Sequence, residues 1–222
     1  MRQNSFNVVQ LAVVLFLVVM VVTVAIAVSN APSRDRWRSP NSTQLRGIHQ
    51  GLVTYANSNK NWFPGIDYHG EDEGISVEKR FHILIDGDYI TPEYAISPSE
   101  TEVIEEWDYE SPLTKNNYSY AMLQVPSEGN RRGEWKQSLN SQAIAMSDRN
   151  TGTPDKLSSI YTDDEGWDWS GSVLWNDNHV SFENSDIFET KYAGSEFNPD
   201  DRLFASPGTD DALMIHSDNE QE

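Results

Sequence analysis

The chain has 222 residues and a formal net charge of −19, with 35 acidic side chains against 16 Lys and Arg. A chain this acidic, with no basic stripe, is repelled by phosphate backbones, which excludes nucleic acid as a partner. Cysteine is absent, which excludes a disulfide framework and any thiolate nucleophile or metal ligand.

The first predicted element is the apolar segment Val8–Val28, which has 21 residues and no charge. At about 1.5 Å per residue, a helix of this length spans the roughly 30 Å hydrocarbon core of a bilayer. The segment therefore predicts a single transmembrane helix, preceded by a leader-like tail at residues 1–7. A signal peptide cleaved after Ala27 is the alternative, although such peptides usually have an apolar core of only about 7–15 residues.

The start of the apolar segment resembles the processing site of type IV prepilins. Ser5 takes the position of the small residue before the cut, which is usually Gly, and Phe6 becomes the new N-terminus. Gln10 takes the position of a Glu whose carboxylate pairs with the N-terminal amine of a neighbouring subunit. Because Gln10 lacks that charge, the resemblance implies slow or partial processing and a supporting role in any fibre.

A hinge at residues 29–40 is predicted to join this segment to a soluble domain at residues 41–222 with an acidic C-terminal tail. Ser39 is suited to cap a helix that has Pro40 at its first position. Apolar residues then recur at helical spacing and predict one buried stripe: Leu45, Ile48, Leu52, Tyr55 and Ala56.

A second helix is predicted between a cap at Ser76 and Gly87. Extended segments follow at Tyr94–Ile96, Tyr118–Met122 and Gln142–Met146, by their alternation or apolar content. The clearest hairpin joins Ser172–Trp175 to His179–Phe182 through Asn176-Asp177-Asn178, because Asn and Asp accept positive φ. A final edge strand is predicted at Ala212–Ile215. Helices and antiparallel strands together predict an α+β fold.

Several stretches, in the same order along the chain, resemble the bacterial prepilin-like family with a pseudopilin-type N-terminus and a C-terminal processing-associated domain. The stretches are Ser42–Leu52, Tyr55–Pro64, Leu84–Ser99, Tyr118–Tyr120 and Ser172–Phe182. The family's conserved His falls on Trp167, its Cys on Ser97 and its turn Gly on Asn178, so roles that depend on those residues are not implied.

The resemblance implies a pilin-like fold, in which a long N-terminal transmembrane and amphipathic helix packs on a small antiparallel sheet. It also implies a soluble domain outside the cytoplasm, anchored in the inner (cytoplasmic) membrane by a single pass. The arginines after the apolar segment oppose this orientation, because positive charge favours the cytoplasmic side: Arg34, Arg36 and Arg38.

No motif for a nucleophile elbow, a phosphate-binding loop or a zinc site is present, so we expect no enzymatic activity. His179 lies beside Asp177 at the predicted turn, where a structural role is favoured over catalysis or metal binding. Acidic clusters are usually solvated loops, but carboxylates also bind Ca²⁺. The best candidates for such a site are Asp200, Asp201, Asp210 and Asp211.

The sequence thus predicts a pseudopilin-like structural protein of a type II secretion or type IV pilus-like assembly. Its expected partners are membrane lipid and other pilin-like subunits or secretion-system components. The alternative is a membrane-tethered module that binds Ca²⁺ or a polymer outside the cytoplasm and does not polymerise.

Overall fold

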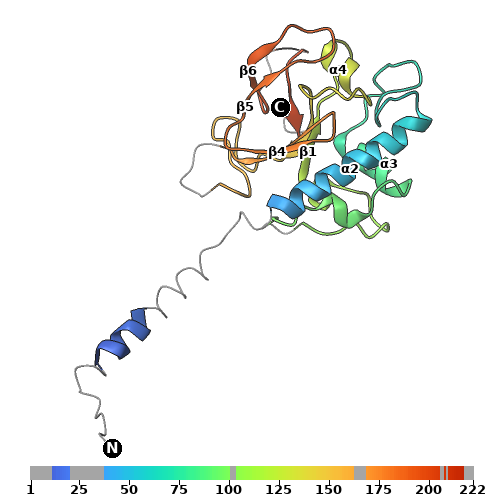
Figure 1. Ribbon diagram of the computed structural model, residues 1–222. Helices are drawn as coiled ribbons and strands as arrows, with labels where there is room; N and C mark the ends of the chain where they lie inside the picture. The colour runs from blue at the N-terminus through green and yellow to red at the C-terminus, as the bar shows by residue number, and fades with distance from the viewer. Residues whose placement is uncertain are drawn as a thin grey trace, which may run out of the picture. The chain divides into compact units, whose positions relative to one another are not determined.

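The computed structural model describes residues 12–20, 38–100, 104–162, 169–205, 208 and 210–217. The chain divides into two units, residues 1–35 and 36–222. In the first unit, residues 12–20 are helical, and their apolar side chains are exposed (Figure 1).

The transmembrane prediction is wrong on this structure. No helix among the described residues has both the length and the apolar character needed to cross a bilayer. The helix at residues 12–20 extends about 14 Å, roughly half of a hydrocarbon core. The remainder of Val8–Val28 lies outside the described residues. The structure therefore does not support the predicted single-pass helix, nor the location in the inner membrane with an extracytoplasmic domain that depended on it.

The second unit combines helices with two antiparallel sheets, which confirms the predicted α+β class (Figure 1). Its helices are α2 (Arg38–Ser58), α3 (Val77–Asp86), η2 (Pro92–Ala95), η3 (Lys115–Asn117) and α4 (Asn130–Glu134). Its strands are β1 (Tyr120–Leu123), β2 (Ile144–Asp148), β3 (Gly171–Trp175), β4 (Val180–Glu183), β5 (Ile187–Thr190), β6 (Asn198–Arg202) and β7 (Met214–Ile215). The larger sheet has the order β4-β3-β2-β1-β7, and β5 pairs with β6.

Helix α2 forms because its apolar residues recur on one face. Four residues of the predicted stripe, Leu45, Ile48, Leu52 and Ala56, are fully inaccessible, and the fifth, Tyr55, is partly buried against the same core. The helix begins at Arg38, earlier than the predicted start at Pro40, so the last residues of the predicted hinge are helical. Proline is tolerated there because the N–H groups of a first turn have no partner within the helix.

Helix α3 confirms the second predicted helix. The Ser76 side chain accepts a hydrogen bond from the Lys79 N–H, and Gly87 is the C-terminal cap. Phe81 stacks on the ring of Tyr118 with centroids 4.5 Å apart. This contact fixes α3 against the segment that enters β1, and Figure 1 shows α3 running beside α2.

The two faces of the larger sheet have different partners. Ser172 and Phe182 pair across β3 and β4 and face α2, where Asn41 bonds to Ser172 and the Arg38 guanidinium lies 3.6 Å from the Phe182 ring centroid. The opposite face carries Trp175, which packs edge-on against Phe188 of β5 at 6.1 Å. The larger sheet therefore lies between α2 and the β5–β6 hairpin.

Two parts of the sequence prediction differ from the structure. The segment Tyr94–Ile96 was predicted to be extended, but residues Pro92–Ala95 form a 3₁₀ turn, because Pro92 presets its first φ angle. The β5–β6 hairpin was not predicted, because β6 reads Asn-Pro-Asp-Asp-Arg and has no apolar alternation.

Candidate functional site

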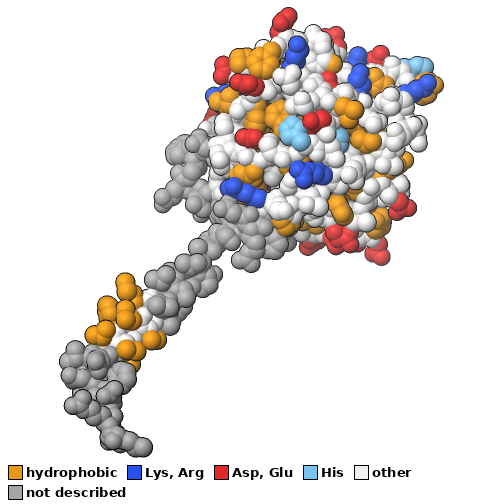
Figure 2. Space-filling view, in the orientation of Figure 1, with side chains coloured by type: hydrophobic (Ala, Val, Ile, Leu, Met, Phe, Trp, Pro, Cys, Tyr) orange, Lys and Arg blue, Asp and Glu red, His pale blue; other side chains and the backbone are white. Residues whose placement is uncertain are grey.

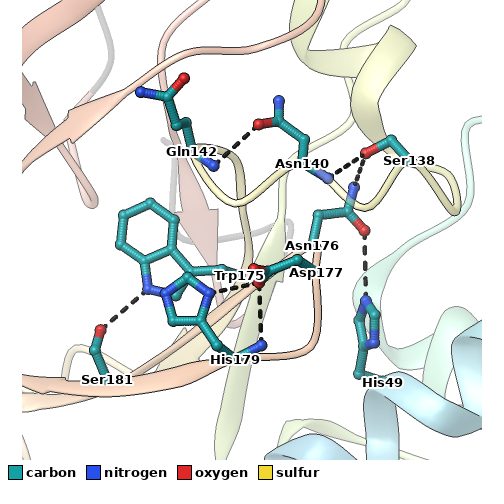
Figure 3. Close-up of polar contacts among 9 residues, drawn as sticks. All are labelled: His49, Ser138, Asn140, Gln142, Trp175, Asn176, Asp177, His179 and Ser181. Carbon is teal, nitrogen blue, oxygen red and sulfur yellow. Dashed lines mark hydrogen bonds and ion pairs between the residues drawn. The ribbon is translucent and has the colours of Figure 1, made fainter.

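The β3–β4 turn and the segments next to it bring several polar side chains into contact with one another (Figure 3). The hairpin forms as predicted: Asn178 has a φ of 72°, and the Trp175 N–H donates to the His179 carbonyl at 3.0 Å. The turn therefore carries Asp177 and His179 at its tip, and its flanking strands fix their positions.

His179 is held by two neighbours. Its Nδ1 lies 2.5 Å from Asp177 Oδ1, so Nδ1–H donates to the carboxylate. Its ring stacks on Trp175 at 5.3 Å with an interplanar angle of 8°, and Trp175 Nε1 in turn donates to Ser181 Oγ at 3.0 Å. The imidazole is nearly half exposed, and Nε2 is the ring nitrogen not bonded to Asp177.

The pKa of Asp177 is lowered despite partial burial, which alone would raise it. The backbone N–H and the imidazole of His179 outweigh the burial, because both donate to the carboxylate. Asp177 is thus ionised and fixes the orientation of the His179 ring, which lies at the surface. An oriented imidazole can bind a carboxylate, a metal ion or a proton donor, but within the described residues no nucleophilic side chain is hydrogen-bonded to it.

Asn176, the first residue after β3, is buried and hydrogen-bonded to residues from other parts of the domain (Figure 3). Its Nδ2 donates to the carbonyls of Glu134 and Lys136 and to Ser138 Oγ at 2.8, 2.9 and 3.0 Å. Its Oδ1 lies 3.4 Å from Nε2 of His49 on α2. The turn is thereby bonded both to the segment after α4 and to α2.

His49 is only 2% exposed, and burial lowers its pKa. The contact with Asn176 and the charge of Asp177 oppose this shift but do not cancel it. The His49 ring also packs edge-on against Phe63 at 5.9 Å. His49 is therefore a neutral core histidine.

A second polar cluster surrounds Asp148 at the end of β2. Asn41 Nδ2 lies 3.0 Å from each Asp148 carboxylate oxygen, and the Ser172 N–H donates to Oδ2 at 2.6 Å. Asn41 Oδ1 accepts from Ser97 Oγ and the Tyr120 hydroxyl at 2.9 and 2.7 Å. Asn41, which also donates to Ser172 Oγ, therefore ties the first turn of α2 to β1, β2, β3 and the segment at Ser97.

Burial raises the pKa of Asp148 to about 6, from an ordinary value of 3.8, although Ser172 and Asn41 donate to the ionised form. Between about pH 4 and pH 6 the folded state then binds the proton more tightly than the unfolded state. The contribution of Asp148 to stability is present below this window and is lost as pH rises through it. This rise in the pKa corresponds to a decrease of about 3 kcal/mol in the free energy of unfolding across the window.

Asp148→Asn should remove this dependence. Urea unfolding measured from pH 4 to pH 7 should show wild type losing up to about 3 kcal/mol relative to Asp148→Asn as pH rises. His49 acts in both proteins with the opposite sign, since its lowered pKa reduces stability below about pH 6.5. Asp155→Asn, in an exposed loop, is the matched control. Parallel profiles for wild type and Asp148→Asn would contradict the assignment.

The four aspartates predicted as calcium ligands have separate environments. Asp201 is buried and accepts from the Thr190 hydroxyl and from the Ala212 N–H at 2.8 Å, and burial raises its pKa. Asp210 accepts from the Asn130 N–H at 3.0 Å, Asp211 accepts from Asn198 Nδ2 at 2.9 Å, and Asp200 is exposed. No group of three or more His, Asp or Glu side chains suited to a metal ion occurs within the described ranges. Calcium binding here stays a prediction.

The predicted processing residues Ser5, Phe6 and Gln10 lie outside the described residues. The sequence analysis did not predict the polar cluster at Asp148. The one feature of the sequence that could have indicated it is an Asp at the end of an apolar run, next to the predicted strand Gln142–Met146. Ser97, where the resembling family has Cys, is part of that cluster as a donor to Asn41.

Comparisons of this chain with models of protein families, with curated proteins and with solved structures find no match.

Proposed function

We propose that this protein is a pilin-like structural subunit of a type II secretion or type IV pilus-like assembly. In this role the helix at residues 12–20 packs against the same helix of neighbouring subunits, and residues 38–217 form the head. The partners are other pilin-like subunits.

The observation that carries the proposal is the exposed apolar helix at residues 12–20. Its large side chains, from Val13 to Met20, are between 49% and 68% exposed, and none of the nine residues is charged. Figure 2 shows the hydrophobic side chains crowded on this segment. A helix that is apolar on all sides requires burial, and parallel copies of the helix can bury one another.

The head supports the same role through its architecture. Helix α2 runs along the face of an antiparallel sheet and is bonded to it by Asn41 and by His49. Such an arrangement suits a head that is carried at the end of a helical stem. The resemblance of the N-terminal segment to prepilins points in the same direction.

Leu17→Asp tests the proposal in the full-length chain. Burying an unpaired charge inside a helix bundle costs several kcal/mol, so self-association should weaken at least about tenfold in sedimentation velocity. Leu17→Met keeps the apolar character and is the matched control. A wild-type chain that stays monomeric across the accessible concentration range, or an unchanged association in Leu17→Asp, would refute the proposed function.

A further inference from the structure

The outer edge of β4 is an open sheet edge in the described part of the domain. In the sheet order, β4 is terminal and pairs only with β3. The opposite terminal strand, β7, is covered on its outer side, where the Met214 N–H donates to the Leu203 carbonyl at 2.6 Å. An uncovered edge is a template for another strand, and proteins normally protect it.

The ladder with β3 determines which backbone groups of β4 face outward. The Trp175–His179 bond makes His179 and Ser181 the residues that bond to β3, so the N–H and C=O groups of Val180 and Phe182 point away. Within the described residues, these outward groups make no backbone hydrogen bond. All four residues of β4 are partly exposed.

Side chains hold this edge in strand geometry. The Phe182 ring lies beneath the Arg38 guanidinium and packs edge-on against Tyr161 at 5.1 Å. On the other face of the sheet, Ser181 accepts the bond from Trp175 Nε1. The edge is therefore preorganised, so β4 would lose little conformational entropy when another strand pairs with it.

We propose that β4 pairs with β4 of a second copy of this chain, antiparallel and in one register, with Ser181 opposite Ser181. In this register the outward groups of Val180 meet those of Phe182 of the second copy, which allows about four backbone hydrogen bonds. The same register places His179 opposite Glu183 of the second copy. The two alternatives, centred on Val180 or Phe182, pair His179 with a serine instead.

Side-chain complementarity is the reason that the occupant is a second copy: the imidazole of His179, which Asp177 holds through Nδ1, meets the carboxylate of Glu183 of the second copy. The pair formed by His179 and Glu183 occurs twice across the two-fold axis, because the strand Val180–Glu183 with its preceding His is self-complementary. Val180 and Phe182 then adjoin on the α2 face as an apolar cross-strand pair. The contact closes a dimer of heads and does not require the helix at residues 12–20.

A single cysteine tests the register, because the chain has no other cysteine. Ser181→Cys places two thiols directly opposite each other, so mild oxidation of the full-length chain should produce a disulfide-linked dimer rapidly. Ser58→Cys, exposed at the end of α2, is the matched control and should cross-link at least about tenfold more slowly. Equal rates for the two variants would overturn the proposal.

The backbone contribution is tested separately with Val180→Pro. Proline removes the outward N–H without touching the bonds to β3, so dimerisation should weaken about tenfold or more, whereas Val180→Thr keeps the N–H and should dimerise as wild type does. Both are measured in the Leu17→Asp background, which separates head pairing from association of the N-terminal helix. If the Leu17→Asp protein with Val180 unchanged is already monomeric, the proposal is also overturned.

The contribution of this side-chain pair is tested with Glu183→Lys, which replaces the carboxylate opposite His179 with an ammonium group. Its dimer should be weaker than that of Glu189→Lys, which makes the same change in net charge on β5, away from the edge. Identical dimerisation by the two variants would reject the register.

Discussion

Trp135→Ala should destabilise the domain by about 3–5 kcal/mol, the largest loss expected from a single core substitution. Trp135 is fully inaccessible, and its Nε1 donates to the Pro64 carbonyl at 2.9 Å. Its ring packs edge-on against Phe63 at 5.2 Å, and the Arg80 guanidinium lies 5.5 Å from the ring centroid. Truncation would leave a cavity and an unpaired carbonyl.

Urea unfolding followed by circular dichroism measures this loss. Trp135→Phe retains most of the ring but not the N–H, so it should cost less than Trp135→Ala. Leu139→Ala is the surface control, because Leu139 is 69% exposed and should change stability by less than about 0.5 kcal/mol. A Trp135→Ala midpoint close to wild type would show that this segment does not contribute to the cooperative core.

Asn41→Ala is expected to have the second largest effect, about 3 kcal/mol at pH 7. Asn41 donates to both oxygens of the buried Asp148 carboxylate and accepts from Ser97 and Tyr120. Its removal leaves a buried charge with fewer donors and the Ser97 hydroxyl without its acceptor, whereas the Tyr120 hydroxyl keeps Gln44 Oε1 at 3.0 Å. The loss should shrink toward pH 4, because a protonated Asp148 depends less on these donors.

The matched control is Asn57→Ala, an exposed position on the same helix. Thermal unfolding at pH 7 and pH 4 gives the comparison. A pH-independent loss in Asn41→Ala would mean that the packing of α2, and not the carboxylate, accounts for the destabilisation.

Local chemistry made part of this fold predictable. The stripe Leu45–Ala56, the cap at Ser76 and the Asn-Asp-Asn turn each act within a few residues, so the sequence alone indicates them. The β5–β6 hairpin escaped because pairing with a neighbour, and not the composition of Asn198–Arg202, makes that segment a strand.

The polar clusters could be predicted only in part. His179 and Asp177 are two residues apart, and their proximity at the turn was visible in the sequence. Asp148 obtains its partners from α2 and β3, at separations of 107 and 24 residues, which no local pattern encodes. The transmembrane prediction from Val8–Val28 was wrong for another reason. An apolar composition shows that a segment favours burial, but it does not distinguish a bilayer from a protein surface.

The bonds of Asn41 have a mechanical consequence. Any tension on the chain ahead of Arg38 enters the domain through the first turn of α2, where Asn41 joins that turn to Asp148 and Ser172. Farther along the helix, His49 meets Asn176. Because α2 rises about 1.5 Å per residue, a slip of a single residue along its axis would break these bonds. A pull along the axis of α2 therefore loads buried hydrogen bonds in shear and distributes the force to β2 and β3 in the middle of the sheet.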